Sequence, residues 1–259
     1  MRHYFLIDGM MIYQTMRTEQ LLQDAQAIWW MPLLEGHRLV GPMLIDAALA
    51  EAAGEPVVLT VGRLMTAFPS RLHLSTIHSQ ADLSALAQHL RRFAAFYDED
   101  AQLVAFRFAD NRRLIDLPSI LTDEQWGYLT SLMTRWTCHN RQGKELTLDL
   151  PQQRSSLQSD QPFRLGAEQI QALEIAAQPD TLLHRLGYTP QMMSTDMSAY
   201  WQLAQQCVAL WKNSGNGNHD ILFYFARRIF STYGRALKER DWQTFLVRAT
   251  PADVVKLED

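Results

Sequence analysis

This chain has few of the residues and spacings that mark catalytic or metal-binding proteins. Its 259 residues include only two cysteines, Cys138 and Cys207, and these lie far apart in the sequence. Neither a disulfide framework nor a thiolate metal site is therefore predicted, and a reducing compartment fits best. The eight histidines include no His-x-x-x-His spacing, and the chain has no Gly-x-Ser-x-Gly segment, Walker-type loop or Gly-x-Gly-x-x-Gly segment. We predict no catalytic residue, no metal and no cofactor.

Long apolar runs and an excess of positive charge are also missing. No stretch approaches the roughly 20 apolar residues of a membrane helix, and the first residues lack the features of a secretory signal. The 24 Lys and Arg residues are outnumbered by 28 Asp and Glu residues, which gives a net charge of -4. Neutralising several phosphates needs clustered basic residues, so a general nucleic-acid binder is not expected. The composition predicts a cytoplasmic globular protein without membrane insertion.

The first part of the chain alternates strand-like and helix-like segments. Short apolar strands, amphipathic helices and a final hairpin together predict an α/β (α+β) domain over residues 1–150, with a mixed sheet and flanking helices. The β-branched run at 56–61 predicts one of these strands, because Val and Thr favour strands. Thr122 and Gln125 have the spacing of a capping box. We expect strands at 3–8, 43–45, 56–61, 102–108, 134–139 and 144–148, and helices at 47–53, at 80–96 and from 122.

The composition changes after residue 150. Residues 151–163 are rich in Gln, Ser and Pro and are interpreted as a linker. Residues 164–259 are almost wholly helix-forming, with breaks at 187–190 and 213–218. The sequence therefore predicts an all-α lobe of three or four helices after the linker.

Charged residues stand at the ends of two predicted strands. Asp8 ends the first strand and is followed by Gly9, which we interpret as a residue that permits a sharp turn. Arg107 lies between two phenylalanines, so strand alternation places its guanidinium on the face opposite to the Phe108 ring. Asp8 and Asp110 are candidate partners for Arg107, and Arg112 is positioned to complete a network of bidentate pairs. This corner is interpreted as a structural clamp or, in the alternative, as a contact for a partner protein.

Two adjacent tryptophans form a second candidate contact. Two neighbouring side chains cannot both point inward from a regular strand, so we expect one of Trp29 and Trp30 to be exposed. We interpret the two tryptophans either as core residues beside a capped sheet edge or as part of a groove for an apolar segment of a partner.

Several short motifs, in this order, resemble the N-terminal domain of the type VI secretion effector chaperones, or adaptor proteins, a family long known as a domain of unknown function. The likeness covers roughly residues 1 to 136. The family's usual final corner is Asp-Pro-Arg, so Asn111 departs from the pattern. The motifs are a strand ending in Ile7-Asp8-Gly9, a strand opening with Gly41-Pro42, a helix with His89-Leu90-Arg91, and the run Phe106-Arg107-Phe108 leading to Asp110-Asn111-Arg112.

The resemblance implies a non-catalytic chaperone from a Gram-negative bacterium. Such a protein binds a cognate secreted effector and loads it onto the spike, or tip, protein of the secretion machine, which implies two separate binding faces. Two alternatives stay open. One is an α/β enzyme with a phosphate or metal site around Asp8 and Arg107, and the other is an immunity-type protein that binds a toxin.

Overall fold

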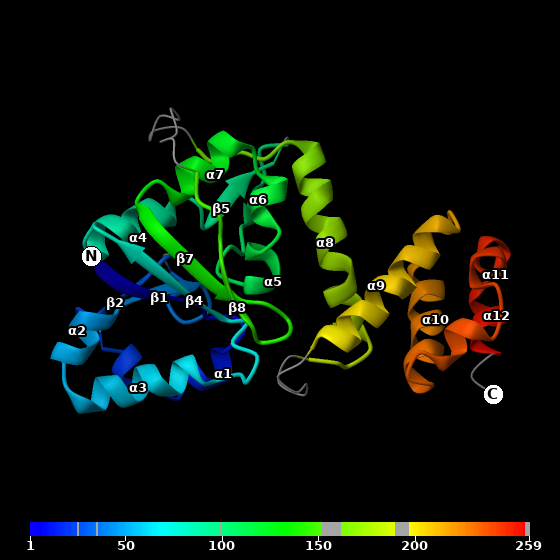
Figure 1. Ribbon diagram of the computed structural model, residues 1–259, viewed down its shortest axis with the longest axis horizontal. Coiled ribbons are helices and arrows are strands. Elements are labelled where there is room, and N and C mark those ends of the chain that lie inside the picture. The colour runs from blue at the N-terminus through cyan, green and yellow to red at the C-terminus, as the bar shows by residue number, and fades with distance from the viewer. Residues whose placement is uncertain (25, 35, 99, 152–161, 190–196, 257–259) are drawn as a thin grey trace. The chain divides into compact units, whose positions relative to one another are not determined.

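The computed structural model describes residues 1–259 except 25, 35, 99, 152–161, 190–196 and 257–259 (Figure 1). The chain divides into two compact units, Met1–Leu173 and Glu174–Asp259. The first unit is α/β and the second is helical, as the sequence predicts. Most of the predicted linker lies outside the described residues.

A six-stranded sheet forms the centre of the first unit, with strand order β2-β3-β1-β4-β7-β8. Each of these strands pairs antiparallel with its neighbours. We expected a mixed sheet, and the observed sheet is antiparallel instead. The strands are β1 (Arg2–Asp8), β2 (Trp30–Pro32), β3 (Pro42–Asp46), β4 (Leu74–Ser79), β7 (Met133–His139) and β8 (Glu145–Thr147).

Helices cover both faces of this sheet (Figure 1). One face carries α2 (Ala47–Ala52) and α3 (Glu55–Met65), with the short α1 (Tyr13–Met16) and η1 (Gln20–Leu22) nearby. The other face carries α4 (Leu83–Arg91), α5 (Asn111–Leu114), α6 (Leu117–Ile120) and α7 (Asp123–Thr130). Alternating sheet residues such as Tyr4, Leu6 and Ile77 join the core beneath α4 and α7.

Residues 56–61, predicted as a strand, are helical in α3. Gly54, at φ 98°, precedes the helix and Pro56 occupies its first turn, where the missing N–H of proline costs nothing. The side chains of Val57, Thr60, Val61 and Leu64 are buried at helical spacing. Burial of this stripe outweighs the weak strand preference of β-branched residues.

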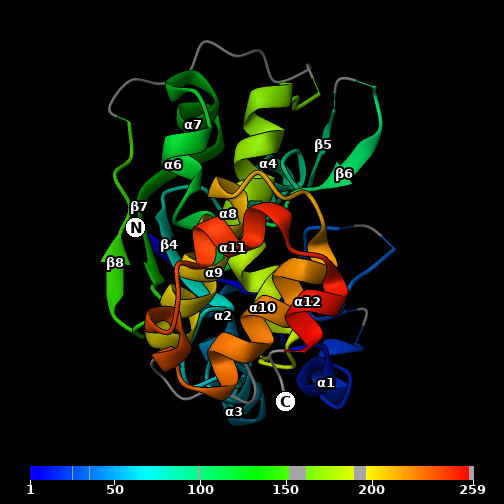
Figure 2. The same ribbon diagram turned by 90° about the vertical axis from the view of Figure 1, so that its right-hand side faces the viewer.

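A separate two-stranded sheet, β5 (Ala95–Tyr97) and β6 (Leu103–Ala105), leads from α4 toward α5. The sequence predicted residues 95–96 as the end of a helix and residues 102–108 as one long strand. In Figure 2, β5 and β6 stand apart from β4, β7 and β8. Phe96, Phe106 and Phe108 are buried in the core of the first unit, and only the short β6 segment is regular strand. Phe163 and Leu165 join the same core, although Phe163 was expected to end a linker.

The second unit contains helices whose bulky apolar side chains pack on one another. Phe225 of α10 and Trp242 of α11 have ring centroids 4.8 Å apart. Asn218 caps α10, and its carbonyl accepts a hydrogen bond from the indole of Trp211. The unit boundary falls inside α8. The helices are α8 (Ala167–Arg185), α9 (Ser198–Asn213), α10 (His219–Ser231), η2 (Arg235–Lys238), α11 (Trp242–Arg248) and α12 (Pro251–Val255).

Candidate functional site

The predicted charged corner forms at the end of β1. One guanidinium nitrogen of Arg107 lies 2.8 Å from Asp8 Oδ2 and 3.3 Å from Asp110 Oδ2. Arg112 donates two hydrogen bonds to the carboxylate of Asp110, from Nε at 2.9 Å and from Nη2 at 2.8 Å. The prediction that these four residues lie together is confirmed. Their two positive and two negative charges compensate one another.

Burial sets the protonation of the two carboxyl groups. Burial raises the pKa of Asp8, and the negative charge of Asp110 adds to the rise, while the positive charge of Arg107 opposes it. Burial would also raise the pKa of Asp110, but the charge and hydrogen bonds of Arg112, together with the charge of Arg107, hold that pKa below its ordinary value. Asp110 is therefore the firmly ionised member of the pair.

Both carboxylates also organise local backbone. Asp110 caps α5 by accepting a hydrogen bond from the backbone N–H of Arg112 at 3.0 Å. Asp8 accepts one from the N–H of Met11 at 3.2 Å and thereby fixes the turn after β1. The corner is thus tied into the fold through both of its acids.

Asn111 stands where the effector chaperones that this chain resembles usually have proline, and it anchors the corner through hydrogen bonds. Its side-chain amide donates to the carbonyls of Leu74 at 2.7 Å and Arg71 at 3.2 Å. Its backbone N–H donates to the carbonyl of Leu72 at 2.9 Å, a bond that proline could not make. The turn is therefore held by hydrogen bonds to the first residue of β4 and to the segment before it.

Gly9 and Gly41 are required by close packing. A Cβ atom on Gly9 would lie 2.5 Å from the carbonyl oxygen of Gly41 and 2.6 Å from that of Leu39. Gly9 lies in the turn after β1, as we interpreted it, but its φ is not positive. The close packing, and not a left-handed backbone conformation, therefore requires glycine here. A Cβ on Gly41 would lie 2.6 Å from Cβ of Leu34. Pro42 pairs with Asp8 across β1 and β3, which places both glycines beside the charged corner.

The expectation that one tryptophan is exposed is wrong. Trp29 is 3% exposed and Trp30 is 2% exposed. Trp29 precedes β2, so strand alternation does not apply to it, and its carbonyl accepts the N–H of Asp46. Arg38 stacks over the Trp30 ring at 5.1 Å. Neither indole is free to contact a partner in this conformation.

The sequence did not reveal that β6 is exposed. Leu103 is 65% exposed, Val104 is 40% exposed, and Ala105 is also exposed. In the described part of the chain, β6 pairs with β5 alone. Apolar strand residues are usually read as core, so only the tertiary structure identifies this run as surface.

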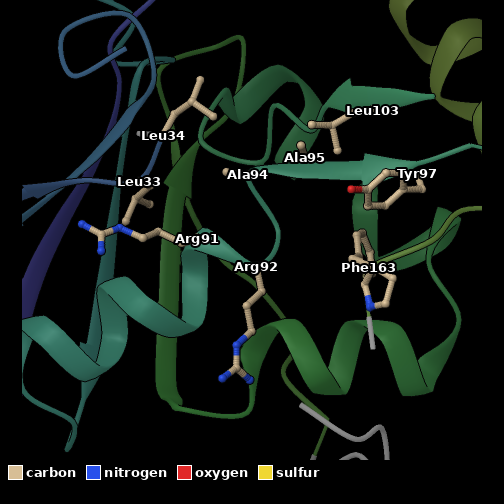
Figure 3. Close-up of a pocket in the computed structure, with 10 residues that line it drawn as sticks. Leu33, Leu34, Arg91, Arg92, Ala94, Ala95, Tyr97, Leu103 and Phe163 are labelled. Atoms are coloured by element: carbon tan, nitrogen blue, oxygen red, sulfur yellow. The ribbon is translucent and has the colours of Figure 1, made fainter. Parts of the chain in front are cut away.

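A pocket of about 300 Å³ adjoins β6 (Figure 3). Figure 3 shows Leu103, Ala95 and Tyr97 on one side of it and Leu33, Leu34 and Arg91 on the other. Arg92 and Phe163 also line it. We call β6 and this pocket the hairpin surface.

The His89-Leu90-Arg91 motif, one of those that resemble the effector chaperones, holds α4 beside the hairpin surface. A ring nitrogen of His89 lies 3.0 Å from the carbonyl oxygen of Leu129 in α7. Leu90 is buried in the core, and Arg91 donates two hydrogen bonds to the carbonyl of Pro32 in β2. The motif therefore fixes the position of the helix end that carries Arg91 and Arg92.

The corner, β6 and most of the residues that line the pocket lie within one recognisable segment. Residues 3–128 match a family described as a domain of unknown function (DUF4123). The matched segment runs from β1 into α7 and covers slightly less than half of the chain. No significant match is found among curated proteins or among solved structures.

Two further observations concern ligands and membranes. Among the described residues, no group of three or more His, Cys, Asp or Glu side chains could hold a metal ion. None of the described helices combines the length and apolar character that crossing a membrane requires.

Proposed function

We propose that this chain is a cytoplasmic adaptor that binds a secreted effector protein of a type VI secretion system and loads it onto the spike protein. The observation that carries the proposal is the exposed apolar strand β6, whose outer edge is unpaired in the described part of the chain. Free strand edges are templates for pairing with another chain. The motifs shared with the effector chaperones support the identity of the partners.

The charged corner has a supporting role in this proposal. Asp8, Arg107, Asp110 and Arg112 are engaged with one another, and the acids also hold backbone N–H groups. This arrangement favours a clamp that holds the end of β1 against the segment leading from β6 to α5. The clamp positions β6 and leaves it available to a partner.

The two compact units support a division of the binding work. The α/β unit carries the hairpin surface, and the helical unit has a core of its own around Phe225 and Trp242. We propose that effector and spike protein bind separate faces of the adaptor.

The test is co-purification of the tagged full-length chain with the effector and spike proteins encoded by neighbouring genes. We expect the chain to retain both proteins together, and to retain each one singly. Failure to retain either protein would overturn the proposal. Turnover of a phosphoester that disappears in Asp8→Asn would instead establish the enzyme alternative, and elemental analysis of the same sample checks for bound metal.

A further inference from the structure

We infer that the hairpin surface binds an extended, acidic segment of the partner, which adds to β6 as a strand and directs its carboxylates toward arginines around the pocket. This inference rests on the proposed adaptor function and specifies the chemistry of the segment that the adaptor recognises.

The backbone pattern of the hairpin defines which groups are free. The N–H of Phe106 donates to the carbonyl of Ala94 at 3.0 Å, and the N–H of Asp98 donates to the carbonyl of Gln102 at 3.1 Å. Antiparallel strands alternate between residues that bond to the partner strand and residues that face away. The N–H and C=O groups of Leu103 and Ala105 therefore point away from β5, at the spacing that an added strand requires.

The other edge of β5 is already occupied. The N–H of Tyr97 donates to the carbonyl of Phe163 at 3.0 Å, and the N–H of Leu165 donates to the carbonyl of Tyr97 at 3.4 Å. In the described part of the chain, the edge that this small sheet leaves for an incoming strand is therefore that of β6. Leu103 and Tyr97 are directly opposite one another and share the face that lines the pocket, so apolar partner side chains on this face would contact both.

Three arginines around the pocket have no carboxylate within ion-pair distance in the described part of the chain. The guanidinium of Arg91 bonds to the Pro32 carbonyl, and that of Arg92 donates to the Tyr128 hydroxyl at 2.9 Å. Arg164 lies over the ring of Tyr97 at 5.6 Å. Among the described residues, these three arginines therefore have no ion-pair partner, in contrast to Arg107 and Arg112 at the corner.

The charge pattern identifies the occupant. A carboxylate that reaches these arginines gains charge-assisted hydrogen bonds, whereas a second copy of this chain would bring like charges together if the same surfaces met. Asp98 of the hairpin turn accepts the N–H of Gln102 at 2.7 Å and forms no ion pair with these arginines in the described part of the chain. An acidic segment of another protein is therefore the occupant that fits.

The inference is tested with labelled synthetic peptides and the full-length chain, by fluorescence anisotropy at low salt. The probes are short peptides that alternate valine and threonine and carry either glutamate or lysine at the central positions. We expect the glutamate peptide to bind about fivefold more tightly than the lysine peptide, since exposed ion pairs contribute up to about 1 kcal/mol each. The preference should shrink at high salt.

Variants separate the two parts of the surface. Arg92→Glu combined with Arg164→Glu should abolish the preference for glutamate, while Arg248→Glu, an exposed arginine of the helical unit, should not. Ala105→Pro removes an N–H group that points away from β5 and keeps the hydrogen bonds to β5. It should therefore weaken the binding of both peptides at least about fivefold. Leu103→Asp should weaken binding, and Leu59→Asp, on exposed α3, is its matched control. Melting curves establish that each variant is folded.

Several outcomes would overturn the inference. These are no peptide binding, equal affinity for the two peptides, or an Ala105→Pro chain that binds as the unmodified chain does. Sedimentation that shows a dimer dissolved by Leu103→Asp would assign the surface to a second copy. If the unmodified chain retains the effector and all the surface variants retain it equally, the inference fails while the adaptor function stands.

Discussion

At the scale of single residues, the charged corner depends most on Arg112. Asp110 is 0% exposed and receives two hydrogen bonds from the Arg112 side chain. Arg107 reaches Asp110 only from 3.3 Å and is itself 41% exposed. The clamp is therefore asymmetric, with Arg112 as the inner partner and Arg107 as the outer one.

We predict that Arg112→Ala lowers the free energy of unfolding by about 1–3 kcal/mol, because it leaves a buried carboxylate short of donors. Chemical denaturation followed by circular dichroism measures this loss. Arg107→Ala is the comparison and should cost less, since its guanidinium is partly solvated. If the Arg112→Ala chain is as stable as the unmodified chain but does not bind its partner, the corner contacts the partner and does not stabilise the fold.

His73 is a second residue whose environment has a measurable consequence. One ring nitrogen lies 2.8 Å from the carbonyl oxygen of Leu64, and Nδ1 has no hydrogen-bond partner among the residues that the structure describes. Burial lowers the pKa of His73 to about 4, and the hydrogen bond to Leu64 only partly offsets this. The folded protein therefore holds this ring neutral where the unfolded chain would protonate it.

We predict that stability falls as the pH drops from about 6.5 to about 4, because the unfolded state binds the additional proton in this window. The full effect of His73 is on the order of 3 kcal/mol. Burial also lowers the pKa of His89 and His139, so the measurement compares the unmodified chain with His73→Gln. Their difference in unfolding free energy should shrink toward acid pH. A constant difference would show that His73 has the same pKa in the folded and unfolded states.

At the scale of elements, the end of β1 depends on a close approach between backbones. Gly9 faces the carbonyls of Leu39 and Gly41, and these belong to the turn that leads into β3. Backbone atoms cannot move aside as a flexible side chain can. The Ile7-Asp8-Gly9 and Gly41-Pro42 motifs, which carry the likeness to the effector chaperones, therefore contact each other.

We predict that Gly9→Ala destabilises the protein by at least about 2 kcal/mol, because the added methyl overlaps two carbonyl oxygens. Gly62→Ala is the control, since nothing lies within 4 Å of its Cβ position in α3. That change should stabilise the helix by up to about 1 kcal/mol. Differential scanning calorimetry of both variants decides the matter, and equal effects of the two alanines would contradict the packing explanation.

At the scale of the whole molecule, the boundary between the units has a practical consequence. Phe163 and Leu165 are buried in the α/β core, and Ile170 and Leu173 pack against it. The α/β unit thus includes the first turns of α8. A cut placed in the predicted linker would remove these side chains from the core.

We predict that residues 1–173 fold cooperatively and melt at a higher temperature than residues 1–159. Loss of Phe163 and Leu165 exposes apolar surface, and each such side chain contributes about 1.5–3 kcal/mol when fully buried. Thermal unfolding of the two fragments measures the difference. Identical melting temperatures would mean that the α/β core is complete by residue 159.

The sequence by itself determined the two-part architecture, the strands at 3–8 and 43–45, the capping box at Thr122 and Gln125, and the hairpin at the end of the α/β unit. Each of these follows from a local pattern of apolar spacing, capping or turn residues. The grouping of Asp8, Arg107, Asp110 and Arg112 was also predictable, because opposite charges at strand ends need partners.

Tertiary structure alone decided the rest. Val57 and Val61 became helical because a buried stripe outweighed their strand preference. Trp29 and Trp30 both became buried because only one of them belongs to a strand. Leu103 became exposed because β6 pairs with β5 outside the central sheet. Local apolarity is the same for a strand in the core and a strand at a free edge, so only the arrangement of neighbouring elements distinguishes them.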